Sequence, residues 1–174
     1  EELRKIPAQV EKVLECNELV GQIAEEIKEA NDIFYLGRGV DYSLAMEGAL
    51  KIKEISYVHA EAFAAGELKH GSIALIDKGT PVVAIATQGK LFEKMVSNMQ
   101  EVRARGARVI AITQEGNTEV EKSADRVIYI PKVDDMFASI TAVVPMQLLA
   151  YHASNIRGLD VDKPRNLAKS VTVE

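Results

Sequence analysis

Apolar residues recur every three or four positions over residues 2–29, and this spacing predicts helix at the start of the chain. The pattern lapses near residues 15–17, so we expect a break in the helix there. Three later segments show helical spacing and are also expected to be helices: residues 43–56, 91–105 and 135–157. A shorter helix is expected at residues 118–124, where Thr118 and Glu121 have the spacing of a capping box.

Five short apolar or alternating runs lie between these helical segments and predict strands at residues 33–36, 58–63, 81–86, 108–113 and 126–130. Three of the runs are almost continuously apolar, as expected for parallel strands that are buried on both faces. Strands that alternate with helices indicate one three-layer α/β/α domain over residues 1–174 with a five-stranded, mostly parallel sheet. No linker or repeat interrupts it, and residues 160–174 form a tail without periodicity.

Ligands of such sheets bind outside the carboxyl ends of the strands, near the point where the strand order reverses. That rule points to Gly37–Asp41, His70 and Thr87–Lys90. Residues 37–39 read Gly-Arg-Gly, but the third glycine of a dinucleotide fingerprint and the lysine of a phosphate-binding loop are both missing. Dinucleotide binding is therefore not expected, and these glycines can serve backbone conformation alone.

Composition narrows the class of protein further. The formal net charge of −5 and the mixing of acids with bases argue against a nucleic-acid partner. No apolar run is long enough to span a membrane, and the first residues lack the apolar core of a secretory signal. The single cysteine, Cys16, allows no internal disulfide and is interpreted as a packed thiol. We expect a cytoplasmic protein, and no histidine or cysteine spacing indicates a metal site.

Glu47, Lys51 and Glu54 lie four and three positions apart, on one face of the expected helix. A lysine between two carboxylates can keep one of them ionised and oriented, as a proton-transferring base requires. The same spacing also fits a solvated stripe of charges, worth a few tenths of a kcal/mol per pair. His70, in a glycine-flanked turn at residues 64–71, can move a proton near neutral pH or be an ordinary surface histidine.

The tail from Pro164 to Glu174 permits two interpretations. It can be a frayed terminus. It can also fold over a pocket and deliver Lys169, whose amine would attack a carbonyl to form a Schiff base.

Three stretches carry a family resemblance. Residues 47–71 (EGALKIKEISYVHAEAFAAGELKHG), residues 144–152 (VPMQLLAYH) and residues 162–174 (DKPRNLAKSVTVE) closely resemble the second sugar-isomerase (SIS) half of the glutamine–fructose-6-phosphate transaminase family. The resemblance covers essentially the whole chain. It implies the SIS fold with strand order 2-1-3-4-5, and the conversion of fructose 6-phosphate and glutamine-derived ammonia to glucosamine 6-phosphate without a cofactor or metal.

The resemblance also implies roles for individual residues. Glu54 matches the base that moves a proton between C1 and C2 of the sugar. His70 matches the histidine that opens the sugar ring in a neighbouring subunit of a homodimer. Lys169 matches the lysine that forms the Schiff base, and Lys51 and Ala168 match substrate-binding positions. Because it contains Lys169, the tail at about residues 160–174 is expected from the resemblance to be a catalytic tail.

Two parts of the family's enzyme have no counterpart in this sequence: the amino-terminal glutaminase domain, and the first SIS half whose Ser/Thr-rich loops hold the sugar phosphate. The chain begins at Glu1 and is interpreted as an excised domain, inactive by itself. Two alternatives stay open: a stand-alone phosphosugar isomerase or deaminase, and a non-catalytic module that binds a sugar phosphate.

Overall fold

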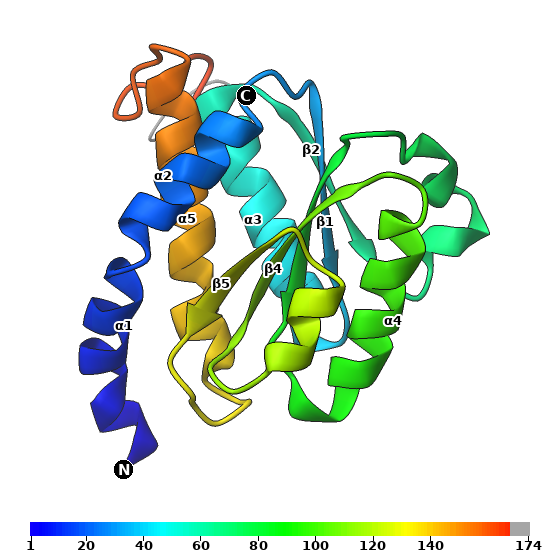
Figure 1. Cartoon of the computed structure of the whole chain (residues 1–174). Helices are drawn as coiled ribbons and strands as arrows, with labels where there is room; N and C mark the ends of the chain where they lie inside the picture. Colours follow the sequence, from blue (N-terminus) through cyan, green and yellow to red (C-terminus); the bar gives the residue numbers. More distant parts are fainter. Residues whose placement is uncertain (168–174) are drawn as a thin grey trace, which may run out of the picture.

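The computed structural model describes residues 1–167. In chain order, the elements are η1 Glu2–Lys5, α1 Ile6–Leu14, α2 Asn17–Glu26, β1 Asp32–Gly37, α3 Val40–Ser56, β2 His59–Ala64, η2 Leu68–His70, η3 Ser72–Leu75, β3 Pro81–Ala86, η4 Gly89–Leu91, α4 Phe92–Arg103, β4 Arg108–Gln114, η5 Thr118–Lys122, β5 Arg126–Ile130 and α5 Ala138–Ile156 (Figure 1). The five strands are parallel in the order β2-β1-β3-β4-β5, so the expected sheet and strand order are confirmed. Each strand begins and ends within two residues of its expected bounds.

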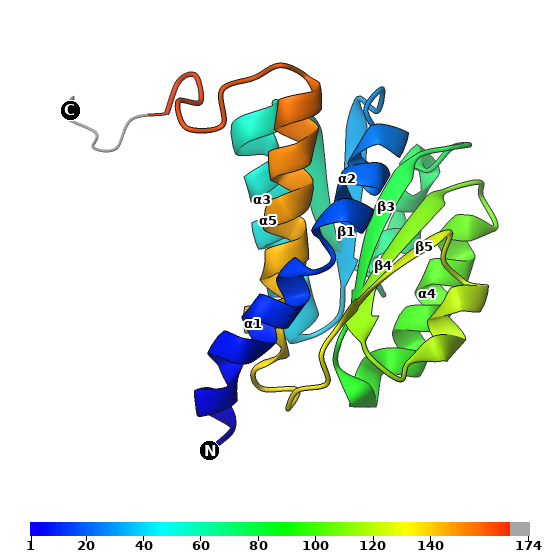
Figure 2. The ribbon, with the colours of Figure 1, turned by 60° about the vertical axis from the view of Figure 1, so that its left-hand side comes forward.

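Helices cover both faces of the sheet, with α3 and α5 on one side and α4 on the other (Figure 2). Alternating strand residues separate the two cores. Ile33 and Tyr35 point into the core beneath α2, α3 and α5, whereas Phe34 and Leu36 point into the core beneath α4. Both cores are rich in branched aliphatic side chains. Burying one such side chain contributes about 1.5–3 kcal/mol to the free energy of folding.

Glycine permits two close approaches that shape the region around α3. At Gly37, which ends β1, a Cβ atom would collide with the backbone of Asp41 and Tyr42, so only glycine fits this tight turn into α3. At Gly48, a Cβ would lie 2.5 Å from Met146 Sδ and 2.8 Å from Tyr35 Cε1. That glycine lets α3 pack closely against both α5 and the sheet.

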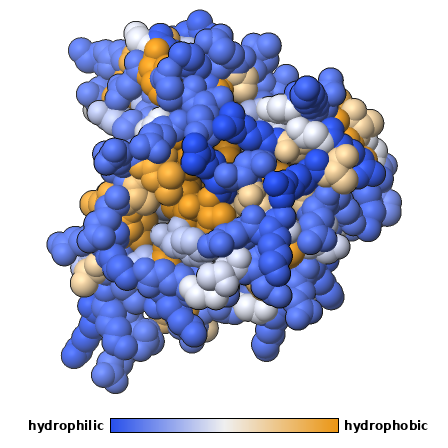
Figure 3. All heavy atoms as spheres, in the orientation of Figure 1, coloured by the Kyte–Doolittle hydropathy of each residue, from blue (hydrophilic) through white to orange (hydrophobic). Residues whose placement is uncertain are grey.

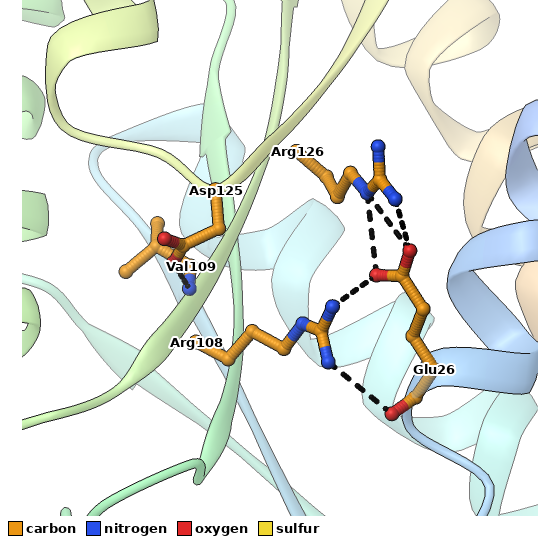
Figure 4. Close-up of polar contacts among 5 residues, drawn as sticks. All are labelled: Glu26, Arg108, Val109, Asp125 and Arg126. Carbon is orange, nitrogen blue, oxygen red and sulfur yellow. Dashed lines mark hydrogen bonds and ion pairs between the residues drawn. The ribbon is translucent and has the colours of Figure 1, made fainter.

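One ion-pair cluster ties the end of α2 to the sheet (Figure 4). The carboxylate of Glu26 accepts hydrogen bonds from the guanidinium groups of Arg108 and Arg126, at the amino ends of β4 and β5. The hydrogen bonds from Arg126, helped by the charges of Arg108 and Arg126, hold the pKa of Glu26 below its usual range, although burial acts in the opposite direction. The cluster therefore stabilises the fold most where Glu26 is ionised.

We expect Glu26→Gln to lower the midpoint of thermal unfolding by a few degrees at pH 7, because the amide loses the charge that both arginines face. A carboxylate with a lowered folded-state pKa stabilises the fold above its unfolded pKa, near 4.3, and that contribution is lost as pH falls through the folded pKa. The difference between wild type and variant should therefore shrink below about pH 4. Glu29→Gln, an exposed neighbour, is the control, and a difference that grows on acidification would contradict this assignment.

The surface in the view of Figure 1 is mostly polar, with apolar side chains gathered where α1 and α5 adjoin β5 (Figure 3). None of the helices in the described part of the chain is both long and apolar enough to cross a membrane.

Candidate active site

The three charged residues singled out on α3 do form one cluster. Lys51 Nζ lies 2.8 Å from Glu54 Oε2 and 3.5 Å from Glu47 Oε1. The Glu54 side chain is 28% exposed and the Lys51 side chain 30%, so the pair is half-buried yet open to a substrate. The hydrogen bond to Glu54 is the main cause that raises the pKa of Lys51. Lys51 therefore stays a cation at neutral pH, which leaves Glu54 as the group in this pair able to accept a proton.

Glu54 lies in the last turn of α3, and one residue of the described tail contacts Tyr57, which directly follows that helix. In Figure 1 the segment after α5, drawn in orange and red, lies at the end of the molecule where α3 and α5 finish. The backbone N–H of Arg165 donates to the hydroxyl of Tyr57, the residue that follows α3, at 2.9 Å. The expected tail residues Ala168 and Lys169 lie outside the described residues, so their positions stay a prediction.

His70 is separated from Glu54 by the sheet. It belongs to η2, whose Leu68 is buried in the core beneath α4, whereas Glu54 belongs to α3 on the opposite face. The His70 side chain is 70% exposed, and its nearest charged partner is Glu67, with Nε2 3.8 Å from Oε2. Within residues 1–167 no hydrogen bond or ion pair joins His70 to Glu54 or Lys51. One chain therefore does not bring its own His70 to its own Glu54.

The loops at the carboxyl ends of the strands do meet, but two backbone N–H donors of the loop after β3 are already used. The buried carboxylate of Asp41 accepts the backbone N–H of Thr87 at 2.8 Å and the Thr87 hydroxyl at 2.6 Å. Asp135 accepts the backbone N–H of Gly89 at 2.9 Å. Gln114 joins the two sides, since its amide donates to the carbonyl of Thr87 at 2.8 Å and to Asp135 at 3.3 Å.

This arrangement is the reverse of a phosphate site. Phosphate binding at such an edge relies on free backbone N–H groups and positive charge, and here two carboxylates take the N–H groups of the loop after β3. Burial raises the pKa of Asp41, while the hydrogen bonds from Thr87 act in the opposite direction. Gly37–Asp41 and Thr87–Lys90 thus come together as expected, yet they form a structural network in which carboxylates occupy backbone N–H groups. In the sequence, this network was signalled by two polar residues at strand ends: Thr87, directly after β3, and Gln114, the last residue of β4.

The remaining candidates have structural partners. His59 Nδ1 lies 2.8 Å from Asp32 Oδ1, and His152 Nε2 lies 2.9 Å from Asn17 Oδ1. Burial raises the pKa of the Cys16 thiol, which disfavours the reactive thiolate. A groove of about 590 Å³ lies at the amino ends of β1, β2 and β3, lined by residues that include Phe34, His59 and Glu61. It lies away from the Lys51–Glu54 pair.

The model of the SIS domain family matches residues 26–157, and the chain belongs to this family. The region matched runs from the end of α2 through α5, which is the whole parallel sheet with the helices that cover it.

Among curated proteins, the chain is 58% identical over 173 residues to glutamine–fructose-6-phosphate aminotransferase [isomerizing] of Thermus thermophilus. That alignment covers 99% of this chain and 29% of the relative, so the chain spans less than a third of the relative's length.

Among solved structures, the chain resembles the C-terminal domain of glucosamine-fructose-6-phosphate aminotransferase from Francisella tularensis, with a TM-score of 0.89 and 43% identity over 94% of this chain and 47% of that one. A putative tagatose-6-phosphate ketose/aldose isomerase from Clostridium novyi NT gives a TM-score of 0.84 at 26% identity, over 98% of this chain and 47% of that one.

Proposed function

We propose that this chain is the second SIS half of an isomerizing glutamine–fructose-6-phosphate aminotransferase, the enzyme that makes glucosamine 6-phosphate from fructose 6-phosphate and glutamine-derived ammonia. The observation that carries this proposal is the Lys51–Glu54 pair near the end of α3, where the next residue along, Tyr57, accepts a hydrogen bond from the tail. Identity of 54–58% over nearly the whole chain to enzymes of that name supports it. The stand-alone alternative has weaker support, because the chain is only 26% identical to the putative tagatose-6-phosphate ketose/aldose isomerase.

In the proposed reaction, Glu54 is the base. The amine of Lys169 adds to the C2 carbonyl of the open-chain sugar and water leaves, which gives an imine. Ammonia then displaces Lys169 at C2, and the Glu54 carboxylate takes a proton from C1 and returns one to C2, so that the carbonyl moves to C1. Lys51 holds the Glu54 carboxylate in place through the 2.8 Å contact, and no redox step is involved. Ala168 lies beside Lys169 in the sequence and is proposed to contact the sugar with Lys51.

The sugar phosphate would be held by the first SIS half. In this chain the carboxyl-edge donors already face Asp41 and Asp135, which would repel a phosphate. An apolar outer face on α3 and α5 offers a surface for that half: Met46, Leu50, Ile140 and Tyr151 are each 41–46% exposed. The two helices run side by side, since Ser154 Oγ donates to the carbonyl of Ile55 near their ends. The glutaminase domain would supply ammonia.

We expect the 174-residue chain alone to convert fructose 6-phosphate at no appreciable rate and to leave glutamine intact, because the groups that position the phosphate are missing. A coupled assay of glucosamine 6-phosphate formation tests this, with the full-length enzyme as the positive control. Robust turnover by the isolated chain would contradict the proposal and favour a stand-alone isomerase.

We also expect the protein to self-associate through the surface near residues 54–72, as a homodimer. Because the sheet separates His70 from Glu54 within one chain, a His70 that opens the sugar ring beside Glu54 has to come from a neighbouring subunit. Sedimentation of the full-length enzyme measures this directly. A strict monomer that keeps full activity would remove His70 from the proposed site.

A further inference from the structure

Arg38, in the turn that follows β1, is a half-buried cation whose hydrogen-bond partner is neutral. Its Nη1 donates a hydrogen bond to Asn98 Oδ1 of α4 at 2.9 Å, and Asn98 is only 5% exposed. Within residues 1–167 no carboxylate forms an ion pair with Arg38. Partly burying a charge without an opposite charge costs free energy, so the stability of the fold alone does not account for an arginine here.

The guanidinium group of Arg38 lies directly against Gly66. A Cβ atom on Gly66 would lie 2.8 Å from Arg38 Nη1 and 3.3 Å from Arg38 Cζ. Gly66 is not among the residues with positive φ in the described part of the chain, so its backbone conformation does not require glycine. The missing side chain instead makes room for the planar guanidinium to pack on the backbone of the segment that follows β2.

The same segment is fixed at two further points. The backbone N–H of Ala65 donates to the carbonyl of Gly37, the residue before Arg38, at 2.9 Å. Leu68 is 2% exposed and packs in the core beneath α4. The chain therefore leaves β2 in a short turn that is held on the α4 side of the sheet (Figure 1).

A series of polar contacts leads from Arg38 to the far end of this turn. Asn98 Nδ2 donates to Glu101 Oε2 at 3.3 Å, and Lys69 Nζ donates to Glu101 Oε1 at 3.5 Å. Arg38, at the start of the turn, and Lys69, at its end, are thus connected through two side chains of α4. The guanidinium is one end of a support that spans the whole turn.

His70 is the next residue and belongs to the turn that these contacts hold. Its backbone N–H donates to the carbonyl of Glu67 at 3.0 Å, whereas its side chain is 70% exposed. The turn fixes the backbone of His70 and leaves the imidazole open to the outside, as required of a group that acts on a neighbouring subunit. Glu54 belongs to α3 on the opposite face of the sheet, so these contacts do not involve it.

We propose that Arg38 is a positioning residue: held by Asn98, its guanidinium supports the backbone at Gly66 and so keeps residues 66–70 in the conformation that presents His70 to the sugar of a neighbouring subunit. This inference rests on the proposed function. It assigns Arg38 no contact with substrate. It predicts that Arg38 governs the opening of the sugar ring and leaves proton transfer at Glu54 unchanged.

The test uses the full-length enzyme with four variants. Arg38→Met keeps the length of the side chain and removes the guanidinium. Gly66→Ala places a methyl group where the guanidinium lies and so displaces it, without changing Arg38 itself. Arg103→Met is the matched control, since Arg103 is also an arginine near α4 but donates to the carbonyl of Lys122, away from the turn. His70→Ala sets the largest effect that loss of ring opening can have.

Two substrates separate ring opening from the later steps. Fructose 6-phosphate closes its ring when its 5-hydroxyl adds to the C2 carbonyl. The 5-deoxy analogue lacks that hydroxyl, and its 6-oxygen carries the phosphate, so the analogue is always in the open form. Its conversion reports the steps at C1 and C2 alone. The ratio of the two rates therefore reports ring opening, and a general loss of stability would not change it.

For Arg38→Met and Gly66→Ala we expect kcat with fructose 6-phosphate to fall by about three- to tenfold, the worth of one hydrogen bond, while kcat with the 5-deoxy analogue stays near that of the wild type. Hydrogen exchange of the peptide 64–71 should rise in both variants, because the turn has lost its support. Arg103→Met should change neither the ratio of rates nor this exchange. His70→Ala should show the same difference between substrates with a larger fall.

The outcomes are distinguishable. An unchanged ratio of rates in Arg38→Met and Gly66→Ala, beside a changed ratio in His70→Ala, would overturn the role of Arg38 and leave the proposed function intact. Equal losses on both substrates would make Arg38 a structural residue and would also overturn the inference. An unchanged ratio in His70→Ala would remove His70 from the proposed site and the role of Arg38 with it.

Discussion

Glu54→Gln should lower the conversion of fructose 6-phosphate by the full-length enzyme by about 10² to 10⁴, the usual contribution of a general base. The amide has nearly the same shape and can still accept a hydrogen bond from Lys51, but it cannot take a proton from C1. Hydrolysis of glutamine, which occurs in another domain of the enzyme, should remain. Formation of glucosamine 6-phosphate and of glutamate, measured in parallel, separates the two activities.

Glu47→Gln is the matched control for this prediction. Glu47 is on the same helix, faces the same lysine at 3.5 Å, and is more exposed than Glu54 at 43% against 28%. An exposed ion pair of this kind contributes about 0–1 kcal/mol, so its loss should change the rate only a few-fold. Equal losses in the two variants would mean that the cluster acts only through its total charge. A Glu54→Gln enzyme of nearly normal rate would exclude Glu54 as the base.

Lys169→Arg should lower the conversion of sugar phosphate by about a hundredfold or more, while glutamine hydrolysis again remains. Arginine keeps the positive charge, but its guanidinium does not lose a proton at working pH and so cannot form an imine. The matched control is Lys163→Arg, the same substitution six positions earlier at an exposed site in the tail. If Lys169 serves only to attract the phosphate by its charge, the arginine variant should keep most of its activity and this role would be wrong.

The centre of the sheet was predictable because β3 and β4 are buried on both faces. Residues 81–86 and 108–113 are almost continuously apolar and rich in β-branched residues, and no amphipathic alternative fits such short runs. The break near residues 15–17 was also predictable, since the apolar spacing lapses where α1 gives way to α2. The strand order came from the family resemblance, because periodicity alone does not say which strands are neighbours.

One local prediction was wrong. Thr118 and Glu121 have the spacing of a capping box, yet the segment is a 3₁₀ helix whose cap residue is Asn117 and whose cap makes no side-chain hydrogen bond. Glu121 instead accepts a hydrogen bond from the Tyr129 hydroxyl at 2.7 Å. Tyr129, eight residues further along in β5, thus binds the Glu121 carboxylate that the local pattern had assigned to the start of the helix.

The candidate site could be predicted only in part. Helical spacing placed Glu47, Lys51 and Glu54 on one face, and the structure confirms that they form a cluster. Spacing could not show that the sheet separates His70 from Glu54, since that depends on which face each connection crosses. It also gave no sign of the hydrogen bond between Tyr57 and Arg165, because the two residues are 108 positions apart.

The most direct test of the proposed function is to locate the covalent adduct. The full-length enzyme would be incubated with fructose 6-phosphate, reduced with borohydride and digested, and the labelled peptide would be identified by mass spectrometry. We expect a reduced sugar-phosphate adduct on Lys169 in the wild type, and none in Lys169→Arg. An adduct on another lysine, or no adduct under conditions where the enzyme turns over, would contradict it.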